Sequence, residues 1–231
     1  NFQKNLDPIL VANQKSQQEL IIQSDKQSEI NDLIYADGNV SVEYRGKIFK
    51  ADNLIYDKST KKLTAKGNIS LILKNQAFKA SHLEYNFNSE KGILLDVKGS
   101  INTRTLMDDL FSNFELSDAN HIAKLLKFKK NEVLNTPREV ENWLFWTDKI
   151  TIDGKKWKSK KAIFSNDLLE LKQVTIVINS LEVISEEEKL RFKSSLNYLI
   201  LDEKVSIPFW FGNRTLAKSE ELLDFENRWT L

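Results

Sequence analysis

The sequence predicts a mainly β protein built from repeated strand pairs, with a small helical insert. Three observations support this prediction: a recurring short phrase, a strict alternation of apolar and polar residues, and turn residues at regular intervals. The phrase is Phe-Lys-Ala followed by a Leu and a Tyr, and it occurs at residues 49–56 and 78–85. A related copy with Trp, Lys and Ser occupies residues 157–164. A repeat with a period of about 30 residues is typical of stacked supersecondary units, none of which buries its apolar face alone.

The alternation of side chains shows which kind of unit is repeated. Val40, Val42 and Tyr44 alternate with Ser, Glu and Arg, and residues 69–73 follow the same rule. Successive side chains of a strand point to opposite faces, so each of these segments has one apolar and one polar face. The alternation slips by one residue between the Ala and the Leu of each phrase, and again between residues 159 and 162. This slip predicts a bend or bulge where the sheet turns a corner.

Turn residues divide the chain into strands. Gly38, Gly67 and Gly99 each lie in a group of turn residues, at intervals that suit strands of about five to eight residues. We expect five regions: a flexible lead-in at 1–19, a first β-repeat series at 20–104, a helical insert at 105–146, a second β-repeat series at 147–216 and a tail at 217–231.

The insert has a different period from the rest of the chain. Leu106, Leu110 and Phe111 recur at helical spacing, and Thr136 and Glu139 form a capping box with Pro137 at the first helical position. We expect two or three short helices that extend through the apolar run ending at residue 146. The pattern leaves open whether the two β series form one sheet or two domains hinged by these helices.

Composition and motifs exclude several classes of function. The chain has 34 basic and 33 acidic residues, and its net charge of +1 argues against a dedicated nucleic-acid binder. It has no cysteine, which excludes disulfides and thiolate metal sites. His82 and His121 lie in different segments without a carboxylate at ligand spacing, and the chain has no nucleophile motif, phosphate-binding glycine loop or catalytic triad. We therefore expect no enzyme activity, no metal site and no cofactor.

Three clusters of charge have a functional and a structural interpretation. The lysine-rich run at 155–161 would suit lipid or nucleic-acid phosphates, but its lysines alternate with Trp157 and Ser159, which favours the solvated outer face of a strand. Paired carboxylates at 108–109 and 186–188 would suit glycoside cleavage. We interpret the first pair as a helix start and the second cluster as a hairpin turn.

The repeats resemble the OstA-like periplasmic repeats of the lipopolysaccharide transport proteins. The resemblance rests on Ala-Asp-Gly-Asn-Val-Ser-Val at residues 36–42 and Ala-Lys-Gly-Asn-Ile-Ser-Leu at 65–71, each followed by the Phe-Lys-Ala phrase. The Trp-Lys-Ser copy at 157–159, Ser-Asn-Asp at 165–167 and Ile-Pro-Phe-Trp at 207–210 resemble the region just before the outer-membrane barrel in the LptD family, most closely its cyanobacterial type.

This resemblance implies an OstA-like β-jelly roll in the periplasm, attached to the outer membrane in the full-length protein. Two curled sheets would form an open V whose apolar interior carries the acyl chains of lipopolysaccharide or a related glycolipid. The implied partners are a periplasmic bridge protein of the same fold, joined by edge-strand addition, and an outer-membrane barrel in cis beyond the tail, which takes over the lipid for outer-membrane assembly. No nucleic-acid partner is expected.

The residues by themselves support the same mechanism. Two sheets hinged along one edge leave a slot, and we expect its lining to be Val40, Val42, Tyr44, Leu54, Tyr56, Ile69, Leu71, Leu73, Leu83, Tyr85 and Val97. The alternative for every one of these positions is an ordinary packed core, as in a structural β-repeat scaffold without a ligand. A carbohydrate-binding sandwich ranks third. We expect the strand at residues 20–23 to be the edge that docks the bridge protein, unless the lead-in covers it.

Overall fold

The computed structural model describes residues 9–13, 18–44, 47–106, 109, 142–166, 174–186, 189–210 and 213–217. Within these residues fifteen strands form one antiparallel sheet, so the mainly β prediction is confirmed. In chain order the strands are β1 (Ile9–Asn13), β2 (Gln18–Gln23), β3 (Lys26–Ile30), β4 (Leu33–Tyr44), β5 (Lys47–Asp57), β6 (Lys62–Leu73), β7 (Gln76–Asn86), β8 (Lys91–Asn102), β9 (Asn142–Asp153), β10 (Lys156–Ser165), β11 (Val174–Glu186), β12 (Lys189–Lys193), β13 (Asn197–Leu201), β14 (Val205–Phe209) and β15 (Arg214–Ala217).

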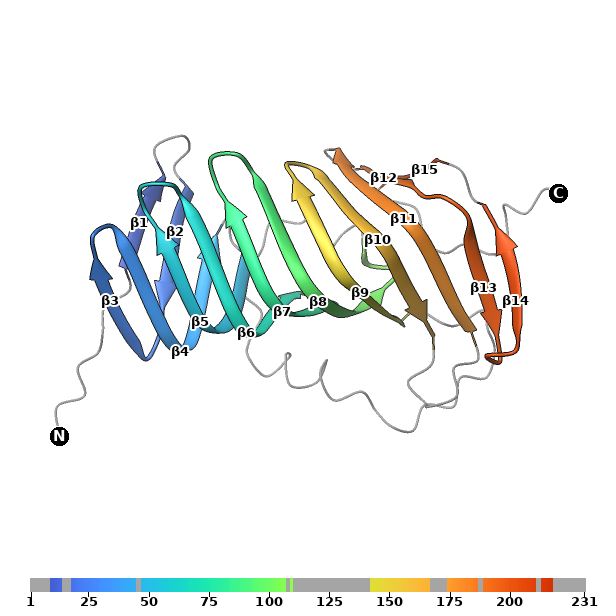
Figure 1. Cartoon of the computed structure of the whole chain (residues 1–231), viewed down its shortest axis with the longest axis horizontal. Coiled ribbons are helices and arrows are strands. Elements are labelled where there is room, and N and C mark those ends of the chain that lie inside the picture. The colour runs from blue at the N-terminus through green and yellow to red at the C-terminus, as the bar shows by residue number, and fades with distance from the viewer. Residues whose placement is uncertain are drawn as a thin grey trace.

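Strands that follow one another in the chain lie side by side over most of the sheet. From β4 to β12 the order in space is the order in the sequence, and Figure 1 shows these strands succeeding one another along the long axis of the molecule. The two β series meet at β8 and β9, which pair over eleven residue positions between residues 91–102 and 142–153. The question that the sequence left open is therefore settled, because both series belong to one continuous sheet.

The sheet folds over into two leaves, as the pairing of β4 and β11 shows. Residues 33–37 of β4 pair with β3, whereas residues 41–44 pair with β2. Residues 174–177 of β11 pair with β13, and residues 182–186 pair with β12. Each long strand between them therefore crosses from one leaf to the other. We call the leaf that contains β3, β12 and β15 leaf A, and the leaf that contains β1, β2, β13 and β14 leaf B.

The bend between the leaves lies where the side-chain alternation slips. The pairing register shifts between Asp37 and Val40 of β4 and between Lys66 and Ile69 of β6. An irregularity of this kind increases the local bend of a strand and lets a sheet turn a corner. The slip was predicted at 51–54, 80–83 and 159–162. The bend is confirmed at the first two, but the extra residue lies on the facing segments of β4 and β6, and no register shift occurs in the pairing of residues 159–162.

Glycine and asparagine form the bend on β4 and β6. Gly38 and Gly67 have φ of 75° and 73°, and Asn39 and Asn68 that follow them also have positive φ. Asn68 Nδ2 donates a hydrogen bond of 2.8 Å to Oδ2 of Asp52 on the adjacent strand. The prediction of turns between strands at Gly38, Gly67 and Gly99 is wrong, because all three lie within twelve-residue strands. A left-handed backbone suits a bulge as well as a hairpin turn, and the sequence does not distinguish the two.

The hydrophobic core lies between the leaves and consists mainly of inward residues from β2 to β9. Its buried members are Leu20, Ile22, Ile34, Ala36, Val40, Val42, Ala51, Leu54, Tyr56, Leu63, Ala65, Ile69, Ala80, Val97, Ile101, Leu106 and Phe145. Most of them come from strands that cross both leaves, so that burial of this cluster holds the leaves together. Hydrophobic burial of this kind is the dominant favourable contribution to folding.

Two predictions about the N-terminal part are wrong. The lead-in at 1–19 was expected to be flexible throughout, but β1 pairs with β2 along its whole length, and β2 begins at Gln18. The strand at residues 20–23 was expected to be a docking edge unless the lead-in covers it. The docking edge is wrong there and the alternative holds, because β1 in the lead-in pairs with residues 18–22 on one side and β4 pairs with residues 20–23 on the other.

The helical prediction is wrong for residues 142–146, which belong to β9. Trp143 and Phe145 are buried, and Leu144 and Trp146 between them are half-buried, which is the period of a strand and not of a helix. At the other end of the insert, the N–H of Asp109 donates to the carbonyl of Thr105 at 2.8 Å, which makes one helical turn. The predictions for 107–108 and 110–141, and for the tail from 218 onward, lie outside the described residues. Over the described part of the chain, none of the helices has the length and apolar character to cross a membrane.

Candidate functional site

All eleven residues predicted to line the slot face the interior between the leaves. Seven of them are at most 4% exposed: Val40, Val42, Leu54, Tyr56, Ile69, Leu73 and Val97. The other four are partly buried: Tyr44, Leu71, Leu83 and Tyr85. The structure thus brings the predicted residues together on one face, but the seven most buried side chains already fill the space between the leaves with one another.

An aromatic cluster joins the two leaves at the N-terminal end of this interior. The ring centroid of Phe87, in the turn after β7, lies 5.0 Å from that of Tyr85 and 6.0 Å from that of Tyr56, both on leaf A. The same ring lies 4.8 Å from Tyr44, at the end of β4 on leaf B. Edge-to-face pairs at such distances contribute about 0.5–1.5 kcal/mol beyond area burial. From β2 to β7 the interior is therefore a packed core closed by contact between the rims.

A second contact crosses the rim of leaf B near β7 and β8. Gln76, which is fully buried, donates from Nε2 to Oδ2 of Asp109 at 2.8 Å, and Thr105 Oγ1 donates to the same oxygen at 2.8 Å. Gln76 Oε1 accepts from the N–H of Asn102 at 2.9 Å. These bonds anchor the segment that follows β8, and Leu106 in that segment is part of the hydrophobic core. The interior is closed on this side too.

From β8 towards the C-terminal end, several inward apolar side chains become exposed to solvent. Trp157 is 43% exposed, and its direct neighbours Ile152 on β9 and Val183 on β11 are partly buried. On leaf B, Ile207 is 44% exposed and pairs with Leu199. Residues directly opposite each other on paired strands share a face, so these side chains continue the row that begins with the core residues. We call the inward residues of β9 to β14 the open inner face. It is open only in part, because Trp143, Phe145, Ala162, Ile176 and Leu190 in it are buried, whereas Trp157, Val205 and Ile207 are exposed.

The open inner face is apolar. Its polar groups at Thr147, Ser159 and Asn197 have partners, whereas the buried Nε1 of Trp143 has no hydrogen-bond partner among the described residues. Thr147 and Ser159 share a hydrogen bond of 2.6 Å at the bend, and the fully buried Asn197 donates to Ser194 Oγ at 2.9 Å. Among the described residues, the inward positions of β8 to β14 hold no charged side chain. Exposed apolar side chains without charges suit a hydrocarbon ligand and offer nothing to a polar substrate.

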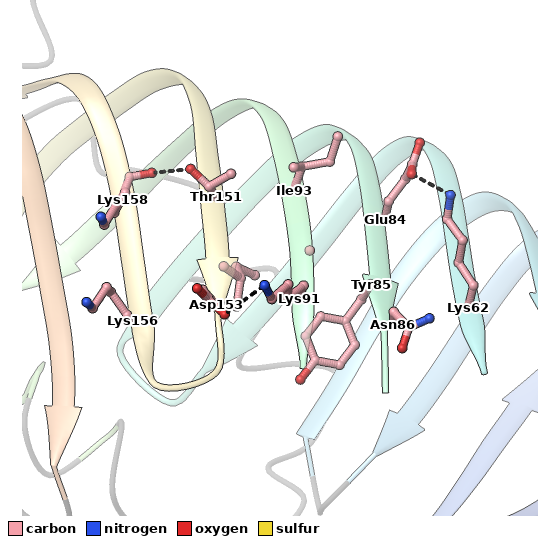
Figure 2. Close-up of a pocket in the computed structure, with 12 residues that line it drawn as sticks. Lys62, Glu84, Tyr85, Asn86, Lys91, Ile93, Thr151, Asp153, Lys156 and Lys158 are labelled. Carbon is pink, nitrogen blue, oxygen red and sulfur yellow. Dashed lines mark hydrogen bonds and ion pairs between the residues drawn. The ribbon is translucent and has the colours of Figure 1, made fainter. Parts of the chain in front are cut away.

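A pocket of about 480 Å³ lies at the rim of leaf A, where β6 to β10 begin or end (Figure 2). The residues that line it are Lys62, Glu84, Tyr85, Asn86, Lys91, Gly92, Ile93, Thr151, Ile152, Asp153, Lys156 and Lys158. We call it the rim pocket. Its four lysines come from three strands, Lys62 from β6, Lys91 from β8, and Lys156 and Lys158 from β10. Tyr85, Gly92 and Ile152 belong to the inward row.

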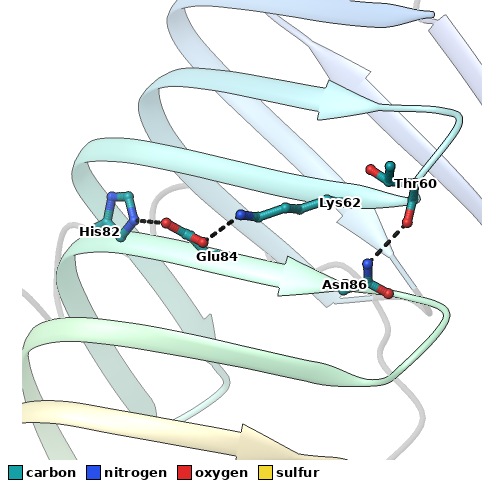
Figure 3. A network of polar contacts seen from close by, with 5 residues as sticks. All are labelled: Thr60, Lys62, His82, Glu84 and Asn86. Atoms are coloured by element: carbon teal, nitrogen blue, oxygen red, sulfur yellow. Dashed lines mark hydrogen bonds and ion pairs between the residues drawn. The ribbon is translucent and has the colours of Figure 1, made fainter.

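A polar network borders the rim pocket on β6 and β7 (Figure 3). Glu84 accepts hydrogen bonds from Lys62 Nζ at 2.7 Å and from His82 Nε2 at 3.0 Å, and Asn86 donates to the carbonyl of Thr60 at 3.0 Å. The bond from Lys62, and then the one from His82, lower the pKa of the Glu84 carboxyl from its ordinary value. The carboxylate therefore stays charged and holds Lys62 beside it. Within the described residues, no group of three His, Asp or Glu side chains is placed to hold a metal ion.

The sequence did not single out Trp157, Ile152, Val183 or Ile207 as lining residues. The alternation in the lysine-rich run contained the signal for Trp157, because the lysines and the tryptophan had to face opposite sides. The structure confirms this part of the interpretation, since Lys158 is exposed on the outer face and Ser159 beside it is buried. Which inward residues stay exposed depends on how far apart the leaves stand, and no local pattern records that separation.

The comparisons with known proteins concern the C-terminal part. A family model described as "Protein of unknown function (DUF3769)" matches residues 137–229. The match spans β9 to β15 and therefore covers most of the open inner face. No curated protein matches the chain.

Proposed function

We propose that this chain is a periplasmic module that binds the acyl chains of lipopolysaccharide or a related glycolipid on its open inner face. In the proposal the module passes the lipid to an outer-membrane barrel in cis, for assembly of the outer membrane. The observation that carries the proposal is the rise in exposure of the inward apolar side chains along the sheet. The inward apolar residues of β4 that form the core are less than 5% exposed, whereas Trp157 and Ile207 are more than 40% exposed.

The energetics of this face suit a hydrocarbon ligand. Burial of each methylene contributes about 0.8 kcal/mol, so a twelve-carbon tail could gain roughly 9 kcal/mol before the cost of ordering the chain. The exposed part of Trp157 and its neighbours would be removed from water by the same event. A solvent-exposed apolar row is costly to keep unless a ligand or partner covers it, which is the reason that we assign the function here and not to the packed half.

The sheet edges suit the proposed partners. Among the described strands, β14 on leaf B and β15 on leaf A each pair on one side only, and both belong to the end of the chain that precedes the proposed barrel. At the other end, β1 and β3 likewise have one partner strand each within the residues that the structure describes, so we move the proposed docking edge for a bridge protein from residues 20–23 to these strands. Strand addition at such edges extends a sheet through main-chain hydrogen bonds.

The second candidate is a structural β-repeat scaffold without a lipid ligand. The packed core from β2 to β7 and the aromatic contact between Tyr44 and Phe87 favour it, because a carrier would not need to close this half. The two candidates differ in what they predict for the open inner face, which a scaffold would cover with protein and a carrier with lipid.

Site-specific photo-crosslinking tests the proposal on two adjacent residues. Val183 faces inward and Ile184 faces outward on the same strand, and both are partly buried. With a photoreactive amino acid at Val183, in cells that make lipopolysaccharide, we expect capture of the lipid. The same amino acid at Ile184 is the matched control and should capture none. Equal capture at both positions, or protein alone captured at Val183, would contradict the carrier function and support the scaffold.

A further inference from the structure

The rim pocket has an excess of positive charge. Four lysines line it against two carboxylates, those of Glu84 and Asp153. Lys62 is neutralised by Glu84 at 2.7 Å, whereas Lys91 Nζ lies 3.7 Å from Asp153 with both side chains about two thirds exposed. An ion pair this exposed contributes little stabilisation, because water competes for both charges. The ammonium of Lys91 can therefore bind another anion.

The lysines of β10 add to this excess. Lys158 Nζ lies 3.1 Å from Glu182 on β11, and Lys193 shares that carboxylate at 3.9 Å. Hydrogen bonding from Lys158, with further attraction from Lys156 and Lys193, lowers the pKa of Glu182. Lys156 itself forms no ion pair with any residue that the structure describes. The single carboxylate of Glu182 is thus the nearby anion for the three ammonium groups of Lys156, Lys158 and Lys193. Lys156 and Lys91 are therefore the least neutralised cations of the rim pocket.

The rim pocket lies at the edge of the open inner face. Lys156 precedes Trp157, and Asp153 follows Ile152, so each charged residue points to the outer face and the apolar residue beside it points inward. Lys91 and Lys156 are the first residues of β8 and β10, so only the end of a strand separates their side chains from the edge of the inner face. One position along a strand corresponds to about 3.3 Å. Gly92 lies in the same inward row between Tyr85 and Ile152 and places no side chain between the two surfaces. Figure 2 shows the lysines of β8 and β10 on either side of the β9 end.

We propose that the rim pocket binds the anionic headgroup, phosphate or carboxylate, of the lipid whose tail lies on the open inner face. Lys91 and Lys156 contact the headgroup, while Lys62 and Lys158 stay paired with Glu84 and Glu182. This inference rests on the proposed function and adds to it a preference for an anionic amphiphile over a neutral one. Ammonium groups beside an apolar surface recognise both ends of such a molecule.

Binding of matched twelve-carbon amphiphiles to the full chain tests the inference. Dodecyl phosphate and dodecanoate are the two anionic probes, and dodecyl maltoside is the neutral one, each measured by calorimetry below its micelle-forming concentration. We expect the Lys91→Glu, Lys156→Glu double variant to bind the anionic probes at least about tenfold more weakly and dodecyl maltoside as before. The probe that suffers the larger loss identifies phosphate or carboxylate as the preferred headgroup.

Two further variants make the outcomes decisive. The control variant Lys66→Glu, Lys149→Glu reverses two lysines of leaf A that lie outside the rim pocket, and it should leave all three affinities within about twofold. Lys91→Gln, Lys156→Gln removes charge without adding repulsion and should give a smaller loss in the same direction. Equal losses for neutral and anionic probes, or losses as large in the control, would overturn the headgroup site but not the carrier function. Failure of the unaltered chain to bind any of the three probes would overturn both.

Discussion

Replacement of Gly67 by alanine tests the account of the bend between the leaves. Gly67 has φ of 73°, and a Cβ at this position would collide with the carboxylate of Asp52, which accepts the hydrogen bond from Asn68. A left-handed backbone costs a residue with a Cβ about 1–2 kcal/mol. Displacement of Asp52 removes a hydrogen bond that contributes about 1 kcal/mol, and the lower entropy of the unfolded alanine chain returns somewhat less than that. We expect Gly67→Ala to lower the free energy of unfolding by about 2 kcal/mol.

Gly154 provides the matched control. It also has positive φ, of 59°, but a Cβ there would lie 3.7 Å from the nearest atom, Oε2 of Glu90, which is an ordinary contact. Gly154→Ala should therefore cost only the backbone term, about 1 kcal/mol. Urea unfolding followed by circular dichroism measures both values. The double variant Asp52→Ala, Gly67→Ala should recover part of the loss. Equal losses for both glycines, together with no coupling to Asp52, would refute the reasoning.

Two further predictions concern carboxylates with different roles. Asp109→Ala removes the carboxylate that accepts from Gln76 Nε2, Thr105 Oγ1 and the N–H of Asn75, although Gln76 Nε2 keeps the Asn102 carbonyl at 3.2 Å. We expect a loss of about 1–3 kcal/mol in urea unfolding. An unchanged midpoint would show that the segment after β8 is not anchored there. Hydrogen bonds from Ser59 and then Thr60 lower the pKa of Asp57 to about 2 from 3.8. Because the folded pKa is the lower one, this stabilisation is complete above pH 4 and is lost as the pH falls towards 2. Unfolding measured at pH 5 and pH 2.5 should show a smaller pH effect in Asp57→Ala than in the unaltered chain, and an equal effect would contradict the assignment.

The faces of the strands could be predicted because they depend on local alternation. Val40 and Val42 were expected on one face and are buried there, and the slip of the alternation located the bend. The same local logic failed at Gly38 and Gly67, since positive φ suits a hairpin turn and a bulge equally well. It failed again at Trp143, because a run of large apolar residues at the end of a predicted helix fits a strand as well.

The rim pocket and the open inner face could not be predicted as sites. Lys62, Lys91 and Lys156 lie far apart in the sequence, and only the pairing of β6 to β10 brings them to one rim. Within the single strand β10, by contrast, the alternation by itself placed Lys156 and Lys158 on the face opposite to Trp157. Clusters formed across strands depend on register, and register is decided by the whole sheet.

The sequence by itself determined that the chain forms repeated strands, which side chains face inward and where the strands bend, because these properties depend on neighbours two to four positions away. Only the tertiary structure decided that both β series join into one sheet, that the half around Tyr44 and Phe87 is closed, and that the half around Trp157 stays open. The distance between the two leaves is set by contacts between residues that are remote in the chain. For that reason the same alternating pattern produces a packed core at one end and an exposed apolar face at the other.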